Sequence, residues 1–240
     1  AQELIPMLDC ALSGEGVRLF PGFSYRHCLV LNHAREGADL TPPHDFTGKP
    51  VSGKLPKGTN AALLRDWMEK ARVLLSNHPV NVKRRASGKN PANAIWFWGE
   101  GRKPALTPFF EKNGLHGTVI SAVDLIQGIG RCAEMNVVKV NGATGTYETN
   151  FTGKAEAAIR ALDGGSDYVY IHIEAPDECG HHSQIKEKIF SIEQIDEKIL
   201  GPVWEYLKVS GEEYAILVLP DHPTPIQIRT HCSDPVPFAL

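Results

Sequence analysis

Apolar and polar positions alternate in regular blocks along the second half of the chain. The runs "TVISA", "YVYIHI" and "AILVL" are apolar on both faces, which is typical of parallel strands that are buried on both sides. Stretches with helical spacing lie between them, and one carries a stripe of isoleucines: Ile185, Ile189, Ile192, Ile195 and Ile199. Strands that alternate with helices predict an α/β fold, with a mostly parallel sheet covered by helices on both faces.

The first half of the chain has a less regular pattern. Asn60 is a candidate helix N-cap, and apolar residues follow it at helical spacing from position 63 to position 75. The runs "RLFPGFSYRHCLVLNH" and "AIWFWG" predict strands, whereas the polar stretches 36–59 and 78–93 predict long connections. We therefore expect two domains, residues 1–111 and 112–240, with the boundary near Lys112.

The composition argues against several classes of protein. The 240 residues carry a formal net charge of −3, whereas a sequence-independent nucleic-acid binder needs a basic surface. No apolar run reaches the roughly 18 residues that span a bilayer, and no secretory signal opens the chain, so we expect no membrane partner. The five cysteines are scattered and odd in number, which favours a reducing, cytoplasmic compartment over a disulfide framework.

Acidic and histidine side chains follow two of the predicted strands. Asp177 and His181 come after "YVYIHIEA", Asp221 and His222 come after "YAILVLP", and His231 follows nine residues later. Because ligands of an open parallel sheet bind outside the carboxyl ends of its strands, we expect these side chains to meet at one edge. Imidazole nitrogen combined with carboxylate oxygen suits zinc or manganese, so the pattern favours a metal site.

Other interpretations of these side chains stay open. A single Asp-His pair often forms only a turn or a helix cap, and the metal interpretation depends on both pairs occurring together. His182 lies beside His181 and competes for the same role, while His172 and Glu174 lie within the predicted strand as core or supporting groups.

Basic residues of the first half suggest an anionic ligand. Arg26 and His27 interrupt an apolar strand, and a basic cluster occupies the polar stretch 83–89. Guanidinium groups bind phosphate or carboxylate in a bidentate manner, so these residues favour a small phosphorylated substrate. For Lys83 and Lys89 the alternative is a solvated loop.

Several motifs together identify a family. The segments "EAPDECGHH", "LPDHPTP" and "RTHCSDPVPF" resemble the metal motifs of the archaeal-type cofactor-independent (2,3-bisphosphoglycerate-independent) phosphoglycerate mutases, within the alkaline phosphatase superfamily. The likeness extends upstream through "GFSYRHCLVL", "HPVNVKRR", "PANAIWFWGEG" and "NGATGTYETNFTGKA", and it covers nearly the whole chain. It implies an alkaline-phosphatase-like α/β domain, present here in part as residues 112–240, with residues 1–111 as an inserted α/β substrate domain.

The resemblance also implies roles for particular residues. One metal would be held by Asp177, His181 and His231, and a second would receive Asp221 and His222. Mn²⁺ is the expected ion, with Zn²⁺ and Mg²⁺ as alternatives. The residues that match substrate-binding positions are Arg26, His27 and Arg84, with Lys154 as a further candidate.

The family reaction belongs to glycolysis and interconverts 3-phosphoglycerate and 2-phosphoglycerate through a phosphoserine. Neither the family's first metal-binding aspartate nor its nucleophilic serine has a counterpart here, and Ser121, Ser183 and Thr224 are poor substitutes. We therefore expect a chain that is truncated at both ends and inactive alone. The alternatives are a metal-dependent phosphatase or sulfatase of the same superfamily, and a non-catalytic domain fragment.

Overall fold

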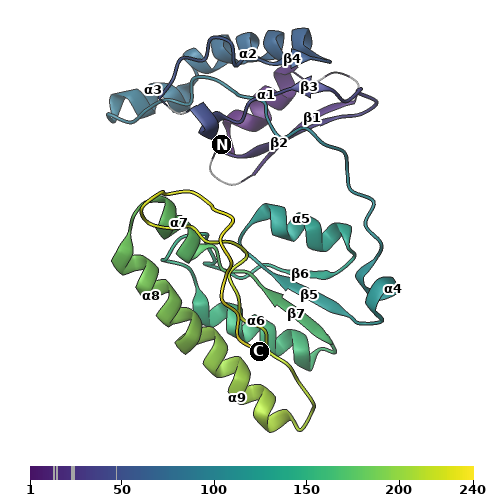
Figure 1. The fold of residues 1–240 in the computed structure, drawn as a ribbon. Coiled ribbons are helices and arrows are strands. Elements are labelled where there is room, and N and C mark those ends of the chain that lie inside the picture. The colour runs from purple at the N-terminus through teal and green to yellow at the C-terminus, as the bar shows by residue number, and fades with distance from the viewer. Residues whose placement is uncertain (13, 15, 23–24, 47) are drawn as a thin grey trace. The chain divides into compact units, whose positions relative to one another are not determined.

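The chain divides into two compact units, Ala1–Lys103 and Pro104–Leu240. A computed structural model covers all 240 residues and describes them with the exception of 13, 15, 23–24 and 47 (Figure 1). The division falls between Lys103 and Pro104, a few residues before Lys112, where the composition of the sequence changes. Each unit has its own hydrophobic core.

The first unit combines helices with two short antiparallel hairpins. Its elements are α1 (Leu4–Leu12), β1 (Val17–Pro21), β2 (His27–Leu31), β3 (Ala38–Asp39), the 3₁₀ turn η1 (Pro43–Phe46), β4 (Lys57–Gly58), α2 (Ala61–Ser76) and α3 (Pro79–Ala86). β1 pairs with β2 and β3 pairs with β4. The core joins one face of α1 to one face of α2, whose buried residues are Leu64, Trp67, Ala71 and Leu75. The helical spacing predicted for 63–75 is therefore confirmed.

Two local expectations for the first unit were wrong, and a third was right in position only. The polar stretch 78–93 contains α3, because His78 caps its first turn through Nδ1, Pro79 opens it and basic residues occupy its last turn. Asn60 does occupy the N-cap position of α2, and its carbonyl accepts the backbone N–H of Leu64. Its φ is 59°, and its side-chain amide donates to the carbonyl of Arg35 and makes no capping hydrogen bond. Residues 94–99, all described, form no strand, and their apolar side chains pack onto the core from irregular backbone.

The second unit is built on a parallel sheet. Its elements are α4 (Phe109–Asn113), β5 (Gly117–Ile120), α5 (Asp124–Cys132), β6 (Asn136–Val138), α6 (Phe151–Asp163), β7 (Tyr168–Ile171), α7 (Ala175–His181), α8 (Ile185–Ile195), the π-helical turn η2 (Asp196–Leu200) and α9 (Gly201–Ser210). The strand order is β6-β5-β7, and both pairings are parallel. Figure 1 shows α5 on one side of this sheet and α6 on the other, as predicted for an α/β fold.

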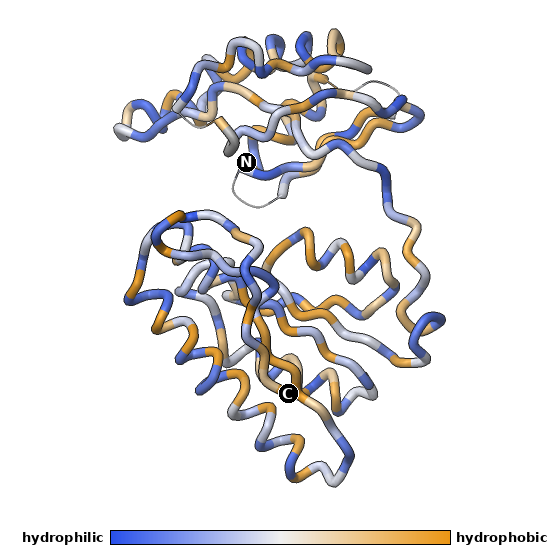
Figure 2. Tube along the Cα trace, in the orientation of Figure 1, coloured by the Kyte–Doolittle hydropathy of each residue, from blue (hydrophilic) through white to orange (hydrophobic). Residues whose placement is uncertain are grey.

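The packing of the second unit departs from the predicted pattern in two places. The isoleucine stripe does lie on a helix, but Ile185, Ile189 and Ile192 are each more than half exposed, and Ile199 of η2 is the buried member. Residues 214–220, all described, form no strand. Their backbone makes a single bridge from Val218 to Ala239, and Leu217 and Leu219 stay exposed; this hydrophobic segment is visible beside the C-terminus in Figure 2.

Among the described residues, no helix is both long enough and apolar enough to span a lipid bilayer.

Candidate metal centre

Helix α7 presents an aspartate and a histidine on one face. It begins directly beyond β7, with Pro176 in its first turn, and it is one of the short segments that follow the carboxyl ends of the strands. Asp177 and His181 are four residues apart, so their side chains lie one above the other. Their Oδ2 and Nε2 atoms are 3.3 Å apart. The spacing along the helix is thus enough to place two donor atoms together, without any contact from a residue distant in the sequence.

The C-terminal segment brings a third donor to this pair. Nε2 of His231 lies 3.3 Å from Oδ1 of Asp177 and 3.1 Å from Nε2 of His181. Four ligands arranged tetrahedrally at the roughly 2.0–2.1 Å typical of zinc lie about 3.3–3.4 Å from one another. Asp177 faces His181 with Oδ2 and His231 with Oδ1, and one donor atom of each residue lies within 4.8 Å of the other two. The triangle of one carboxylate and two imidazoles is therefore close to the spacing that a divalent cation requires. Among the described residues, these three form the one group able to hold a metal.

A backbone carbonyl fixes the ring of His181. Its Nδ1 lies 2.9 Å from the carbonyl oxygen of Arg229, which can only accept a hydrogen bond. Nδ1 therefore carries a proton, and Nε2 directs its lone pair toward Asp177 and His231. Arg229 has a φ of 56°, a left-handed conformation that is uncommon for a non-glycine residue. A hydrogen bond from the second ring nitrogen to a carbonyl oxygen is the usual way in which proteins orient a metal-binding imidazole.

His222 and Asp221 lie at the edge of this triangle. The ring of His222 is in contact with that of His231, with centroids 3.7 Å apart. Nε2 of His222 is 3.5 Å from Oδ2 of Asp221, whose side chain is 70% exposed. The structure thus brings both strand-end clusters together, although the run before Asp221 is not a strand.

His182 is not part of the triangle. It forms a second pair four residues apart with Glu178, at 3.7 Å between Nδ1 and Oε2, and its Nδ1 also lies 2.9 Å from the carbonyl of Glu178. Among the described residues, no third donor completes this pair. Of the two competing histidines, His181 therefore has the geometry of a ligand, and the Glu178–His182 pair is a natural internal control.

Buried polar groups support the start of α7. Lys154 on α6 is 1% exposed, and its Nζ donates to the carbonyl oxygen of His172, at 3.1 Å. Burial lowers the pKa of Lys154 to about 8, and the opposing effect of Glu174 is smaller. Burial also lowers the pKa of His172, and the charge of Lys154 adds to this shift. Lys154 therefore contacts the backbone between β7 and α7.

The other predicted substrate residues belong to the first unit. Arg26 is exposed, and its guanidinium carbon lies 5.4 Å from the centroid of the Tyr25 ring. His27 begins β2, and its Nδ1 accepts the backbone N–H of Gly22; burial and the N-terminal amino group lower its pKa. Arg84 on α3 is exposed and uses Nε to bind the carbonyl of Asn90.

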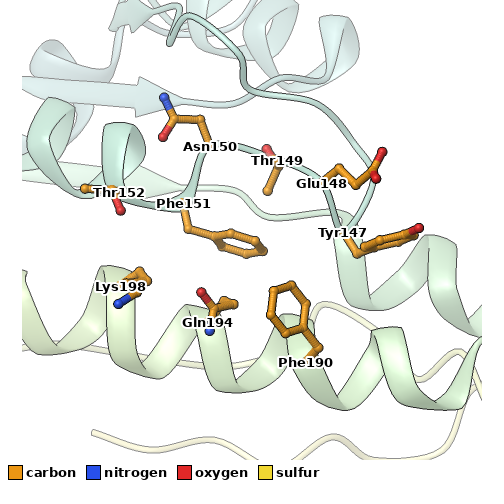
Figure 3. Close-up of a pocket in the computed structure, with 9 residues that line it drawn as sticks. All are labelled: Tyr147, Glu148, Thr149, Asn150, Phe151, Thr152, Phe190, Gln194 and Lys198. Carbon is orange, nitrogen blue, oxygen red and sulfur yellow. The ribbon is translucent and has the colours of Figure 1, made fainter.

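A hollow of about 440 Å³ opens in the second unit between the start of α6 and α8 (Figure 3). Figure 3 shows the rings of Phe151 and Phe190 pointing toward one another across it. The nine described residues that line it include none of the predicted site residues. The metal triangle is therefore a separate feature.

Comparison with known families agrees with this geometry. The model of the Metalloenzyme superfamily matches residues 39–240. The chain belongs to this superfamily. A divalent metal follows from that membership, and the three donors of the triangle all lie within the matched residues.

Two of the most similar proteins are named as phosphoglycerate mutases. The 2,3-bisphosphoglycerate-independent phosphoglycerate mutase of Methanothrix thermoacetophila is 54% identical over 225 residues, which are 94% of this chain and 57% of that protein. The enzyme of the same name from Methanosarcina mazei is 48% identical over 241 residues, which cover 100% of this chain and 60% of that protein. The chain thus spans less than two thirds of the length of these relatives.

Solved structures confirm the fold class. A protein from Pyrococcus horikoshii matches with a TM-score of 0.72 at 28% identity, covering 98% of this chain and 57% of that one. The cofactor-independent phosphoglycerate mutase of Thermoplasma acidophilum matches with a TM-score of 0.56 at 25% identity, over 91% of this chain and 56% of that one. The resemblance inferred from the motifs is confirmed, and so is an α/β fold of the alkaline-phosphatase type.

Proposed function

We propose that this chain supplies the larger part of a metal-dependent phosphoglycerate mutase that interconverts 3-phosphoglycerate and 2-phosphoglycerate, a step of glycolysis. The observation that carries the proposal is the triangle of Asp177, His181 and His231. The two imidazole Nε2 atoms lie 3.1 Å apart, and each lies 3.3 Å from one of the two carboxylate oxygens of Asp177. The names of the most similar relatives supply the reaction. The five free cysteines support a cytoplasmic location.

In this proposal Asp177, His181 and His231 hold one divalent cation, while Asp221 and His222 contribute to a second. Nitrogen and oxygen donors in this ratio suit Mn²⁺, our first choice, and also Zn²⁺. Bound cations would supply the positive charge that a transferred phosphoryl group requires. The chain's own contribution is to hold the donor atoms on α7 and on the C-terminal segment at the spacing of a coordination shell.

The first unit is proposed to bind the rest of the substrate. Arg26 and Arg84 are exposed and carry guanidinium groups, which match phosphate and carboxylate oxygens in pairs. His27 is a third candidate, because it begins a strand beside Arg26. Lys154 is proposed in a different role, because its amino group is buried and bonded to the His172 carbonyl. It supports the backbone that leads into α7.

The test is a chimera in which these 240 residues replace the matching stretch of the Methanosarcina mazei mutase. We expect the chimera to convert 3-phosphoglycerate to 2-phosphoglycerate in the presence of Mn²⁺, and the 240-residue chain alone to show no turnover, because it lacks a serine nucleophile. Asp177→Asn should lower the turnover of the chimera more than about 100-fold, since even residues behind the ligands cost 10–100-fold. Glu178→Gln is the matched control and should leave it unchanged.

Two results would contradict the proposal. A folded chimera without mutase activity would contradict the proposed function. Release of inorganic phosphate without formation of 2-phosphoglycerate would assign the centre to a phosphatase instead.

A further inference from the structure

Thr224 lies in a rigid turn that packs closely against α7. It is flanked by Pro223 and Pro225 and is 5% exposed. Nζ of Lys188 on α8 donates to the carbonyl of Thr224 at 3.1 Å and to that of Pro176 at 2.9 Å, so it joins the turn to the start of α7. Gly180 permits the approach, because a β-carbon there would lie 2.5 Å from the carbonyl oxygen of Thr224.

The hydroxyl of Thr224 lies between the two strand-end clusters. Oγ1 donates a hydrogen bond to Oδ1 of Asp177, and it also lies 3.3 Å from Nδ1 of His222. A hydroxyl has one proton, and an ionised carboxylate can only accept. The proton of Thr224 therefore goes to Asp177, and Nδ1 of His222 must be the donor to Oγ1.

This donor order fixes the tautomer of His222. With its proton on Nδ1, the neutral ring has a lone pair on Nε2. That atom lies 3.5 Å from Oδ2 of Asp221, which also carries only lone pairs and is beyond ordinary hydrogen-bond distance. Two acceptor atoms at this distance can bind one cation together, because two ligands at about 2.1 Å from a shared metal lie about 3.4 Å from one another.

We propose that Thr224 is a positioning residue that couples the two halves of the metal centre. It links a ligand of one half to a ligand of the other through the chain His222 Nδ1–H to Thr224 Oγ1–H to Asp177 Oδ1. It orients the Asp177 carboxylate toward His231 and His181, and it turns Nε2 of His222 outward with a free lone pair. The inference rests on the proposed metal centre, but its first test needs no metal.

The first test reads the tautomer of His222 in the metal-free 240-residue chain. Long-range ¹H–¹⁵N correlation spectra of histidine-labelled protein at about pH 8.5, where an ordinary imidazole is neutral, distinguish the two ring nitrogens. We expect Nδ1–H in the wild type and in Thr224→Ser, which keeps the hydroxyl. Thr224→Val keeps the shape and should lose this preference. A proton on Nε2 in the wild type would overturn the inference.

The second test is calorimetric titration of the same proteins with Mn²⁺. Loss of a group that orients a ligand typically costs 10–100-fold in metal affinity, and we expect this loss for Thr224→Val. Thr224→Ser should bind within about threefold of the wild type, which separates loss of the hydroxyl from a general loss of structure. Equal affinity of Thr224→Val and wild type would overturn the inference. A wild type that binds no Mn²⁺ would instead overturn the metal centre, and the tautomer would still decide the role of Thr224.

Discussion

Two neighbouring pairs on α7 show how little local chemistry separates a metal site from a surface pair. Asp177–His181 and Glu178–His182 each pair a carboxylate on α7 with a histidine four residues later, at the end of the helix. What separates them is position around the helix axis, since only the first pair faces His231 and the turn that contains Thr224. Residue type alone left both histidines as candidates, and the family resemblance favoured His181. In the structure the contact with His231, 50 positions away, separates the two pairs.

The buried amine of Lys154 predicts that the stability of the chain depends on pH. Its pKa falls from 10.5 to about 8 in the folded chain, because burial disfavours the charged amine. Below pH 8 the amine is charged in both states, and its burial costs about 3 kcal/mol. Between about pH 8 and 10.5 the unfolded state binds more protons than the folded state, so the stability of the wild type rises with pH.

Lys154→Met removes this titration. Near pH 7 we expect the variant to be more stable than the wild type by about 2 kcal/mol, after about 1 kcal/mol is subtracted for the lost hydrogen bond to His172. The difference should shrink steadily between about pH 8 and 10 as the wild type gains stability. Urea unfolding of both proteins across this range measures it. A difference that does not change with pH would show that the Lys154 amine keeps its ordinary pKa.

At the scale of elements, hydrophobic periodicity predicted the helices and strands whose position depends on burying one face. The spacing of 63–75 gave α2, and the runs before Ser121 and His172 became neighbouring parallel strands. The apolar run 214–220 failed as a strand because a strand is defined by its partner, and this segment pairs at Val218 alone. Helix α3 was missed because its surface is polar, and its stability comes from capping by His78 and from Asn81, which is buried and bonded to two carbonyls.

The site also contains residues that the sequence predicted and residues that it did not. Residue type and position after a strand were enough to make Asp177 and His181 candidates, and the family resemblance grouped them with His231. Thr224 and Gly180 were not recognised in these roles, because one acts through the direction of a hydrogen bond and the other through a missing side chain. Neither property leaves a periodic signal in a sequence.

The close packing of Gly180 against Thr224 predicts that a side chain at position 180 lowers the stability of the chain. Gly180→Ala places a β-carbon 2.5 Å from the carbonyl of Thr224, so α7 and the turn must separate. We expect a loss of about 1–3 kcal/mol in the free energy of unfolding, as for other overpacked sites. Gly128→Ala on α5 is the control, because a β-carbon there meets no heavy atom within 4 Å, and it should stabilise the chain by about 0.5–1 kcal/mol. Urea unfolding that finds Gly180→Ala as stable as the wild type would contradict the close packing.

At the scale of the whole molecule, the proposed chemistry is divided between two units. The exposed arginines Arg26 and Arg84 belong to Ala1–Lys103, whereas all three donors of the triangle belong to Pro104–Leu240. The similar phosphoglycerate mutases are longer, and the chain covers 57–60% of them. Turnover depends on the longer protein in our proposal, but cation binding at the triangle depends on one unit alone. Metal affinity is therefore the property that can be measured on these 240 residues.

The most direct measurement is calorimetric titration of the 240-residue chain with Mn²⁺ and Zn²⁺, with two neighbouring histidine variants. We predict that the wild type binds a cation and that His182→Gln binds it equally well. His181→Gln should bind it more than about 100-fold more weakly, because it removes one of three protein ligands rather than a supporting contact. No heat of binding in the wild type, or equal losses in both variants, would contradict a metal centre at Asp177, His181 and His231.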